Sequence, residues 1–187
     1  MSFPGIPSLD AAVMAFIQTH FHNTVTDTVF PIITSLGEAG IGWIVLSLVL
    51  LCFKKTRRTG GLVLIAMTVT LLFGELTLKN IICRLRPCNV FTDFPMLIAR
   101  PTSYSFPSGH TSSSFAAALI LTLCHKKVGW LAYIPAVLIA FSRIFLFVHY
   151  PTDVLAGILL GTLAALLTYF AAKAIQKRQA EKRTAQI

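Results

Sequence analysis

The sequence predicts an all-α, integral-membrane bundle of five transmembrane helices, preceded by amphipathic helices that lie along the membrane interface. Three observations predict it. The 187 residues are 55% hydrophobic and only 12% charged, where soluble domains carry about 25% charged residues. Several apolar runs approach the roughly 20 residues that span a bilayer. The basic residues gather at the ends of these runs. We therefore expect one membrane-embedded domain over residues 1–187 and exclude a soluble enzyme.

The first 35 residues differ from the rest of the chain. They contain no Lys or Arg, and polar residues interrupt every candidate span within them. The apolar spacing of Ala12, Val13, Phe16 and Ile17 favours an amphipathic helix on the membrane surface. Residues 1–35 are expected to form interfacial helices, and a six-span bundle in which this region crosses once is the alternative.

The transmembrane bundle is expected over residues 36–172. Runs of apolar residues predict its five spans at Leu36–Phe53, Gly60–Ile82, Pro107–Cys124, Val128–Val148 and Pro151–Ala172. Residues 173–187 form a basic tail, which we expect to be frayed from Gln176 onward because it is polar and terminal.

The net charge of +9 is a topology signal rather than a sign of nucleic-acid binding. Eleven of the 16 basic residues lie in three clusters, at 54–58, 126–127 and 173–183. With five crossings all three clusters fall on one side of the membrane, which the positive-inside rule makes cytoplasmic. We therefore expect a multi-pass cell-membrane protein with a cytoplasmic C-terminus and no nucleic-acid partner. Residues 84–106 and 149–153 then share the extracytoplasmic face.

The other five basic residues lie inside the spans or on their far side, and they are Lys79, Arg84, Arg86, Arg100 and Arg143. Arg143 interrupts an otherwise uncharged helix, where an arginine costs about 2.5–3.5 kcal/mol. It therefore needs a carboxylate partner such as Glu75, or a function. Glu75 is also spaced to pair with Lys79. The seven-residue step from Lys79 to Arg86 returns to nearly the same helix face.

A long loop leads into the sequence Phe106-Pro107-Ser108-Gly109-His110. We expect Pro107 at the first position of a helix, with the Ser108 and Gly109 amides free to face an anion. Glycine at 109 permits a close approach of the backbone. Taken alone, His110 at this helix entrance reads as an ordinary interfacial histidine.

A last group of polar residues connects the fourth and fifth spans. Ser142 and His149 are seven residues apart, which predicts one helix face, and Pro151 breaks the helix so that Asp153 can turn back toward the imidazole. A carboxylate on one ring nitrogen fixes the tautomer and leaves the other nitrogen free to attack. Asp153 also suits the first turn of a helix.

Together these residues resemble the three-part signature of the type-2 phosphatidic acid phosphatase family. The matching blocks are Lys79 with six residues to Arg86-Pro87, then Pro107-Ser108-Gly109-His110, then Ser142-Arg143 with five residues to His149 and three more to Asp153. No position of the signature departs from the pattern, which covers about two fifths of the chain.

The resemblance implies a lipid phosphatase and assigns the site residues. His149 would be the nucleophile that forms a phosphohistidine, Asp153 would orient it, and His110 would be the general acid and then the general base. The substrate phosphate would be bound by Lys79, Arg86, Ser108, Gly109 and Arg143. Because three cationic side chains neutralise the phosphate, no metal and no cofactor are expected.

The expected partners are membrane lipids, with a lipid phosphate as the substrate. An extracytoplasmic site suits undecaprenyl diphosphate, which we favour, and also phosphatidylglycerophosphate or phosphatidic acid. The sequence indicates no oligomeric state. Vanadate-dependent haloperoxidases share a similar signature but are soluble. A transporter or flippase of anionic lipids, acting without hydrolysis, is the alternative from another class, because it too would place charges at helix breaks.

Two further features are left open by the sequence. Arg84 and Arg100 lie in the long loop and either contact the substrate or are solvated charges that attract anionic lipid headgroups. Cys83 and Cys88 flank residues 84–87 on the side where oxidation can occur, so they are either free thiols or a disulfide that would clamp Arg86.

Overall fold

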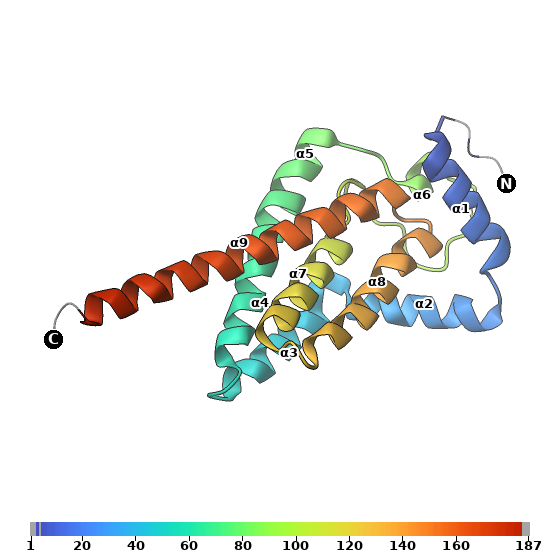
Figure 1. Cartoon of the computed structure of the whole chain (residues 1–187). Helices are drawn as coiled ribbons and strands as arrows, with labels where there is room; N and C mark the ends of the chain where they lie inside the picture. The colour runs from blue at the N-terminus through green and yellow to red at the C-terminus, as the bar shows by residue number, and fades with distance from the viewer. Residues whose placement is uncertain (1–2, 4, 185–187) are drawn as a thin grey trace.

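The computed structural model describes residues 3 and 5–184, and every regular element in this part of the chain is helical (Figure 1). The helices in chain order are α1 Ser8–His20, α2 Thr24–Leu36, α3 Ile41–Cys52, α4 Arg57–Thr70, α5 Lys79–Ile82, α6 Pro87–Val90, α7 Gly109–Cys124, α8 Tyr133–Phe145 and α9 Pro151–Thr184. A π-helical segment, Leu71–Leu78, joins α4 to α5. The predicted all-α fold is confirmed.

The apolar helices are those of a membrane protein. Two helical stretches of the described chain, Arg57–Val90 and Pro151–Thr184, are each long and apolar enough to cross a bilayer. Helices α2 and α3 would form a third crossing if the pair, which is bent by 44°, is taken as one span. Helix α7 and residues Gly129–Phe145 are apolar but shorter. The membrane-embedded bundle is therefore confirmed, and its five crossings stay a prediction.

The prediction of one continuous span over Leu36–Phe53 was wrong. The chain breaks between α2 and α3, where Ala39 and Gly40 have positive φ angles of 47° and 70°. Such angles end a helix, and they are easy for glycine but unusual for alanine. Hydropathy does not reveal this break because the residues on both sides of it are apolar. The break brings Glu38 to the wall of a cavity described below.

The predicted fraying from Gln176 onward was wrong as far as Thr184, and residues 185–187 lie outside the described part of the chain. The end of the last membrane span at Ala172 stays a prediction. Helix α9 continues through Thr184, and its C-terminal part extends past the other helices (Figure 1). The added residues are mostly Ala, Lys, Gln, Arg and Glu, which favour helix even when they are exposed.

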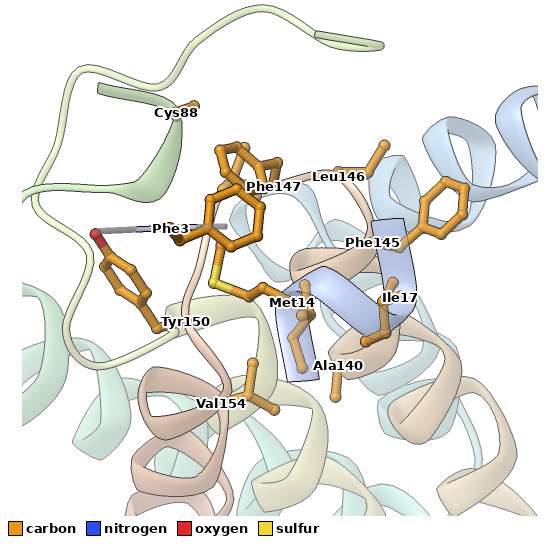
Figure 2. Packing of buried hydrophobic residues seen from close by; sticks show 12 residues of the cluster. Phe3, Met14, Ile17, Cys88, Ala140, Phe145, Leu146, Phe147, Tyr150 and Val154 are labelled. Atoms are coloured by element: carbon orange, nitrogen blue, oxygen red, sulfur yellow. The ribbon is translucent and has the colours of Figure 1, made fainter. Parts of the chain in front are cut away.

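Aromatic packing fixes the N-terminal helix against the bundle. Met14 and Ile17 of α1 are buried against Phe145, and Phe3 and Phe147 lie in the same cluster (Figure 2). The inward face of α1 also contains the polar residues Asp10 and Gln18, whereas Phe16 is exposed. The helix predicted near Ala12–Ile17 is present, but the face that it buries includes a carboxylate.

Close backbone contact places α7 beside α9. A Cβ atom added at Gly157 would lie 2.7 Å from the Ser108 carbonyl oxygen, and one added at Gly161 would lie 2.3 Å from the Ser112 carbonyl oxygen. Only glycine permits this approach. The contact brings the start of α7, with Ser108 and His110, next to the start of α9, with Asp153.

Candidate active site

A cavity of about 890 Å³ lies between the α2–α3 turn, α4, the loop at 98–103, α7 and α8. Six of the eight residues expected in the site line this cavity, and they are Lys79, Arg86, Gly109, His110, Arg143 and His149. The other two, Ser108 and Asp153, are fully buried and do not line the cavity. Residues from three distant segments of the sequence therefore meet at one place.

His149 lies in the turn between α8 and α9 and has a different partner at each ring nitrogen. Its Nδ1 atom is 3.5 Å from Oδ2 of Asp153, and its Nε2 atom is 2.8 Å from Nη1 of Arg86. A guanidinium only donates hydrogen bonds, so Nε2 is the acceptor and Nδ1 carries the proton. The unprotonated nitrogen is therefore the one beside the cationic side chains.

The surroundings of His149 keep the ring neutral. Burial lowers the pKa of His149 well below its ordinary value, and the positive charges of Arg86, Arg143 and Lys79 lower it further. A depressed pKa means that the imidazole is unprotonated at neutral pH. Its Nε2 lone pair can attack an electrophile once the hydrogen bond from Arg86 is transferred to a bound ligand.

Asp153 is held from several sides at the start of α9. Its Oδ2 atom accepts hydrogen bonds from the Tyr150 amide at 2.9 Å and from the Ser105 hydroxyl. Its Oδ1 atom accepts a hydrogen bond from Arg84 at 2.7 Å. A carboxylate with this many donors is fixed in orientation.

Four cationic side chains line the cavity, and they are Lys79, Arg86, Arg100 and Arg143. Among the described residues, only Lys79 of these four has an acidic partner. Both carboxylate oxygens of Glu75 lie 2.7 Å from Nζ of Lys79. Arg86 donates to the carbonyl oxygens of Ser103 and Val148 as well as to His149. The pair between Glu75 and Lys79 is therefore formed, and the alternative pair between Glu75 and Arg143 is not.

Arg143 is 3% exposed and is held by the hydroxyl of Thr34 on α2. Its Nε atom is buried and has no hydrogen-bond partner. A buried guanidinium without a carboxylate is costly unless an anion satisfies it. The cavity therefore suits an anionic ligand.

A larger residue at 109 would displace the carboxylate of Glu75. A Cβ atom at this position would lie 2.1 Å from Oε1 of Glu75. Helix α7 begins at Gly109 with Ser108 as its N-cap, so the expectation that Pro107 is the first helical residue was wrong. Because the Ser108 amide donates to the Asp153 carbonyl oxygen at 3.1 Å, it is not a free anion donor, contrary to the expectation. Phosphate binding by Ser108 stays a prediction that depends on its hydroxyl.

His110 reaches the cavity from the first turn of α7. Its Nε2 atom is buried without a hydrogen-bond partner and lies 3.6 Å from a carboxylate oxygen of Glu38. Packing holds the ring in place, since a Cβ atom at Gly37 would come within 2.9 Å of it. An imidazole nitrogen with no fixed partner beside an anion site is suited to proton transfer.

Two of the predicted helical registers were wrong although the residues do converge. Helix α8 ends at Phe145, and Phe147 has a φ of 59°, so Ser142 and His149 do not share a helix face. Helix α5 ends at Ile82, and the short helix α6 begins at Pro87, so Lys79 and Arg86 do not share a helix face. Turns rather than one continuous helix bring these residues together.

Sequence reasoning missed the role of Arg84 and did not find Ser105. Arg84 neither contacts the cavity nor stands free in solvent, because it forms ion pairs with Asp10 and Asp153. Arg100 lines the cavity and binds backbone carbonyl oxygens at 88, 92 and 94. No spacing rule indicates these contacts, since each joins a loop residue to a distant segment. Cys83 and Cys88 are free thiols.

We expect Ser105→Ala to lower the turnover rate of this site by about tenfold. Loss of a residue that orients another functional group usually lowers activity by about 10- to 100-fold, and this expectation is at the low end of that range. The hydroxyl of Ser105 donates to Asp153, so its loss weakens the hold on the carboxylate that orients His149. The matched control is Ser47→Ala, which removes a buried hydroxyl bonded to the Trp43 carbonyl on α3. Equal rates for the two variants would contradict this role.

The residues that line the cavity do not form a metal site. Within residues 3 and 5–184, no group of three or more His, Cys, Asp and Glu side chains is arranged to hold a metal ion. The group nearest to Nε2 of His149 is the guanidinium of Arg86, which repels a divalent cation. The expectation of a metal-independent reaction stays a prediction, for which a test is given below.

Comparison with known proteins identifies relatives over most of the chain. The family model described as the PAP2 superfamily matches residues 59–177. An undecaprenyl-diphosphatase from Sulfolobus acidocaldarius is 39% identical over 127 residues, which are 67% of this chain and 61% of that protein. The bacitracin transport permease protein BcrC of Bacillus licheniformis is 33% identical over 145 residues, covering 76% of this chain and 71% of that protein.

A solved structure extends the similarity to nearly the whole fold. The PAP2-type phosphatidylglycerolphosphate phosphatase from Bacillus subtilis has a TM-score of 0.73 and 29% identity, and the match covers 92% of this chain and 89% of that one.

Proposed function

The chain belongs to the PAP2 superfamily, and from this premise we propose that it is a membrane lipid phosphatase that acts through a phosphohistidine. One observation carries the proposal. The unprotonated Nε2 atom of His149 lies beside Arg86 in a cavity that Lys79 and Arg143 also line, while Nδ1 lies toward Asp153. A neutral histidine with an oriented ring and an adjacent anion site is the arrangement that attack on a phosphorus atom requires.

The charge of the site suits a phosphate dianion. The four cationic side chains that line the cavity and the carboxylates of Glu38 and Glu75 together leave two formal positive charges around it. Arg86 and Arg143 would bind the nonbridging oxygens with their forked N–H groups, and the amide of Gly109 would add a directional donor. The same groups stabilise the charge on the transferring phosphoryl group in the transition state.

The reaction then runs in two steps. His149 Nε2 attacks phosphorus, and the bond from phosphorus to the leaving oxygen breaks. His110, whose protonated form the bound phosphate anion would stabilise, gives its proton to that oxygen. Next, His110 takes a proton from water, which attacks the phosphohistidine and releases inorganic phosphate. Asp153 accepts the hydrogen bond from Nδ1 and stabilises the imidazolium formed in the first step.

The cavity has an apolar part that supports a lipid substrate. Beyond the charged residues, its walls include Ile44, Leu64, Met67 and Leu71, which come from α3, α4 and the π-helical segment. An isoprenoid or acyl chain would occupy this part while the phosphate lies beside His149. Of the lipid phosphates, we favour undecaprenyl diphosphate, and the name of the Sulfolobus relative supports this choice. Phosphatidylglycerophosphate is the second candidate, supported by the name of the similar structure.

The basic clusters at 54–58, 126–127 and 173–183 support an extracytoplasmic site. In that orientation the C-terminus is cytoplasmic, and the loops that carry Arg86 and His149 face the other side. Release of phosphate into that compartment would follow from this placement.

The proposal is tested by measuring phosphate release from undecaprenyl diphosphate, phosphatidylglycerophosphate, phosphatidic acid and a water-soluble phosphate monoester, using detergent-purified protein. We expect release from the lipids, fastest from undecaprenyl diphosphate. If no lipid releases phosphate, the proposal is wrong, and a transporter or flippase without hydrolysis becomes the better account.

We expect EDTA to leave the rate of phosphate release unchanged, because cationic side chains supply the charge neutralisation that Mg²⁺ supplies in other phosphoryl-transfer enzymes. The measurement compares initial rates with EDTA, without it, and with EDTA plus excess Mg²⁺. Loss of activity in EDTA that Mg²⁺ restores would contradict the proposed charge balance.

A further inference from the structure

We propose that Arg84 and Asp10 are positioning residues of the active site, because Arg84 bridges the buried carboxylate of Asp10 on α1 to the carboxylate of Asp153 that orients His149. The inference rests on the proposed function. It makes the N-terminal helix a part of the catalytic scaffold, although α1 contributes no residue to the walls of the cavity.

The guanidinium of Arg84 contacts four residues of the described chain. Its Nη1 atom donates to Oδ1 of Asp153 and to Oγ1 of Thr152, each at 2.7 Å. Its Nη2 atom donates to Oδ2 of Asp10 at 2.7 Å, and its central carbon lies 3.8 Å from the centre of the Tyr150 ring. A planar group with this many fixed contacts can hold Asp153 in one orientation.

Asp10 is completely buried although it lies in the first turn of α1. Its Oδ1 atom accepts from the Thr152 amide at 2.9 Å, and its Oδ2 atom accepts from the Thr152 hydroxyl and from Arg84, both at 2.7 Å. A buried carboxylate is tolerated only when it is paired and hydrogen-bonded in this way. Asp10 therefore binds the first turn of α9, which carries Asp153.

In this network the two carboxylate oxygens of Asp153 have different hydrogen-bond partners. Oδ1 is bound to Arg84, so Oδ2 remains directed to the His149 side, together with the Ser105 hydroxyl and the Tyr150 amide. Asp10, Arg84 and Asp153 together carry one negative charge, which complements the imidazolium that forms when His149 is phosphorylated. Loss of either Asp10 or Arg84 frees Asp153 to rotate and disturbs this balance.

Neither Asp10 nor Arg84 lines the cavity, so the proposal predicts an effect on kcat and not on KM. We expect Asp10→Asn, which keeps the size of the side chain, to lower kcat by about 10- to 100-fold, the range seen for partners that orient a first ligand or base. Arg84→Lys keeps the charge but cannot bridge both carboxylates, so we expect it to retain more activity than Arg84→Gln. KM for the lipid is expected to stay close to the wild-type value.

The matched control is Gln18→Ala. Gln18 lies on the same buried face of α1 and donates to the carbonyl oxygen of Phe145 at 3.0 Å, but it does not contact Asp10, Arg84 or Asp153. If docking of α1 alone matters, Gln18→Ala lowers kcat as much as Asp10→Asn, and the proposal is overturned. A wild-type kcat in Asp10→Asn or in Arg84→Gln overturns it as well. Should Asp10→Asn not fold, the comparison of Arg84→Lys with Arg84→Gln decides.

A second measurement separates this inference from the proposed function. In protein labelled with ¹⁵N at histidine, the difference spectrum against His149→Ala reports the protonation of both His149 nitrogens without any substrate. We expect protonated Nδ1 and unprotonated Nε2 in the wild type and in both variants, because Arg86 still donates to Nε2. In Arg84→Gln and Asp10→Asn we expect a changed chemical shift of Nδ1, which faces Asp153. If the wild type hydrolyses no lipid phosphate, the proposed function fails, and this spectrum still decides the positioning role. An unchanged Nδ1 chemical shift in Arg84→Gln would overturn it.

Discussion

His149→Ala is expected to abolish phosphate release, with a fall in kcat of at least about 10⁴-fold, as when other covalent nucleophiles are removed. The reason is that His149 is the proposed nucleophile. Its Nε2 atom lies 2.8 Å from Arg86, and its Nδ1 atom lies 3.5 Å from Asp153, which orients the ring. The measurement is phosphate release from a lipid diphosphate by protein that still purifies as one monodisperse species.

The control for this variant is His125→Ala. His125 follows α7 at its other end, where its Nε2 atom is 3.0 Å from the hydroxyl of Thr59, and it does not line the cavity. We expect His125→Ala to keep wild-type turnover. Substantial turnover in His149→Ala, or an equal loss in both variants, would remove His149 as the nucleophile.

Arg143→Gln is expected to lower kcat/KM by about 10²- to 10³-fold, the usual cost of removing one preorganised donor to a transition-state oxyanion. Arg143 is buried, is held by Thr34 and has an unpartnered Nε atom, so a large part of its charge is available to a phosphate. Arg143→Lys should recover part of the lost kcat/KM, because lysine restores the positive charge but not the paired N–H donors of the planar guanidinium. Steady-state kinetics on the preferred lipid measure both effects.

Thermal unfolding of the same variants separates binding from folding. Replacing a buried charge with a neutral side chain is often neutral or stabilising, so we expect Arg143→Gln to unfold at or above the wild-type temperature. The exposed residue Lys177 on α9 provides the matched charge control, and Lys177→Gln should leave kcat/KM unchanged. If Arg143→Gln has wild-type kinetics, Arg143 does not bind the phosphate.

The helical membrane fold was predictable because hydropathy depends only on composition along the chain. The breaks between helices were not predictable. Between α2 and α3 the chain turns at Ala39 and Gly40, and an alanine with positive φ has no signature in a sequence. The length of α9 was not predicted either. The polar residues from Gln176 onward indicate a frayed terminus, but they also have high helix propensity, and the helix continues through Thr184.

The candidate site was predictable to the extent that its residues follow a signature of fixed spacing. Lys79, Arg86, His110, Arg143 and His149 all line one cavity, although two of the helical faces used to place them were wrong. The signature was a better guide than helical periodicity because turns after Phe145 and Ile82 set the actual geometry.

The residues that support the site were not predictable. Asp10 interrupts an apolar run, so the sequence presents it as a mark of an interfacial segment. In the structure it is fully buried and lies 2.7 Å from Arg84. Such a pair joins positions 74 residues apart, and neither hydropathy nor spacing within one helix reports a contact of this kind.

The most direct test of the account is the covalent intermediate itself. Wild-type protein is mixed with the lipid diphosphate that it hydrolyses fastest, quenched within the first turnover at alkaline pH, where phosphohistidine is stable, and mapped by mass spectrometry. The account predicts phosphate on His149, which accumulates in His110→Ala because hydrolysis of the intermediate then lacks its base. Turnover with His149 unmodified and phosphate on another residue would contradict it.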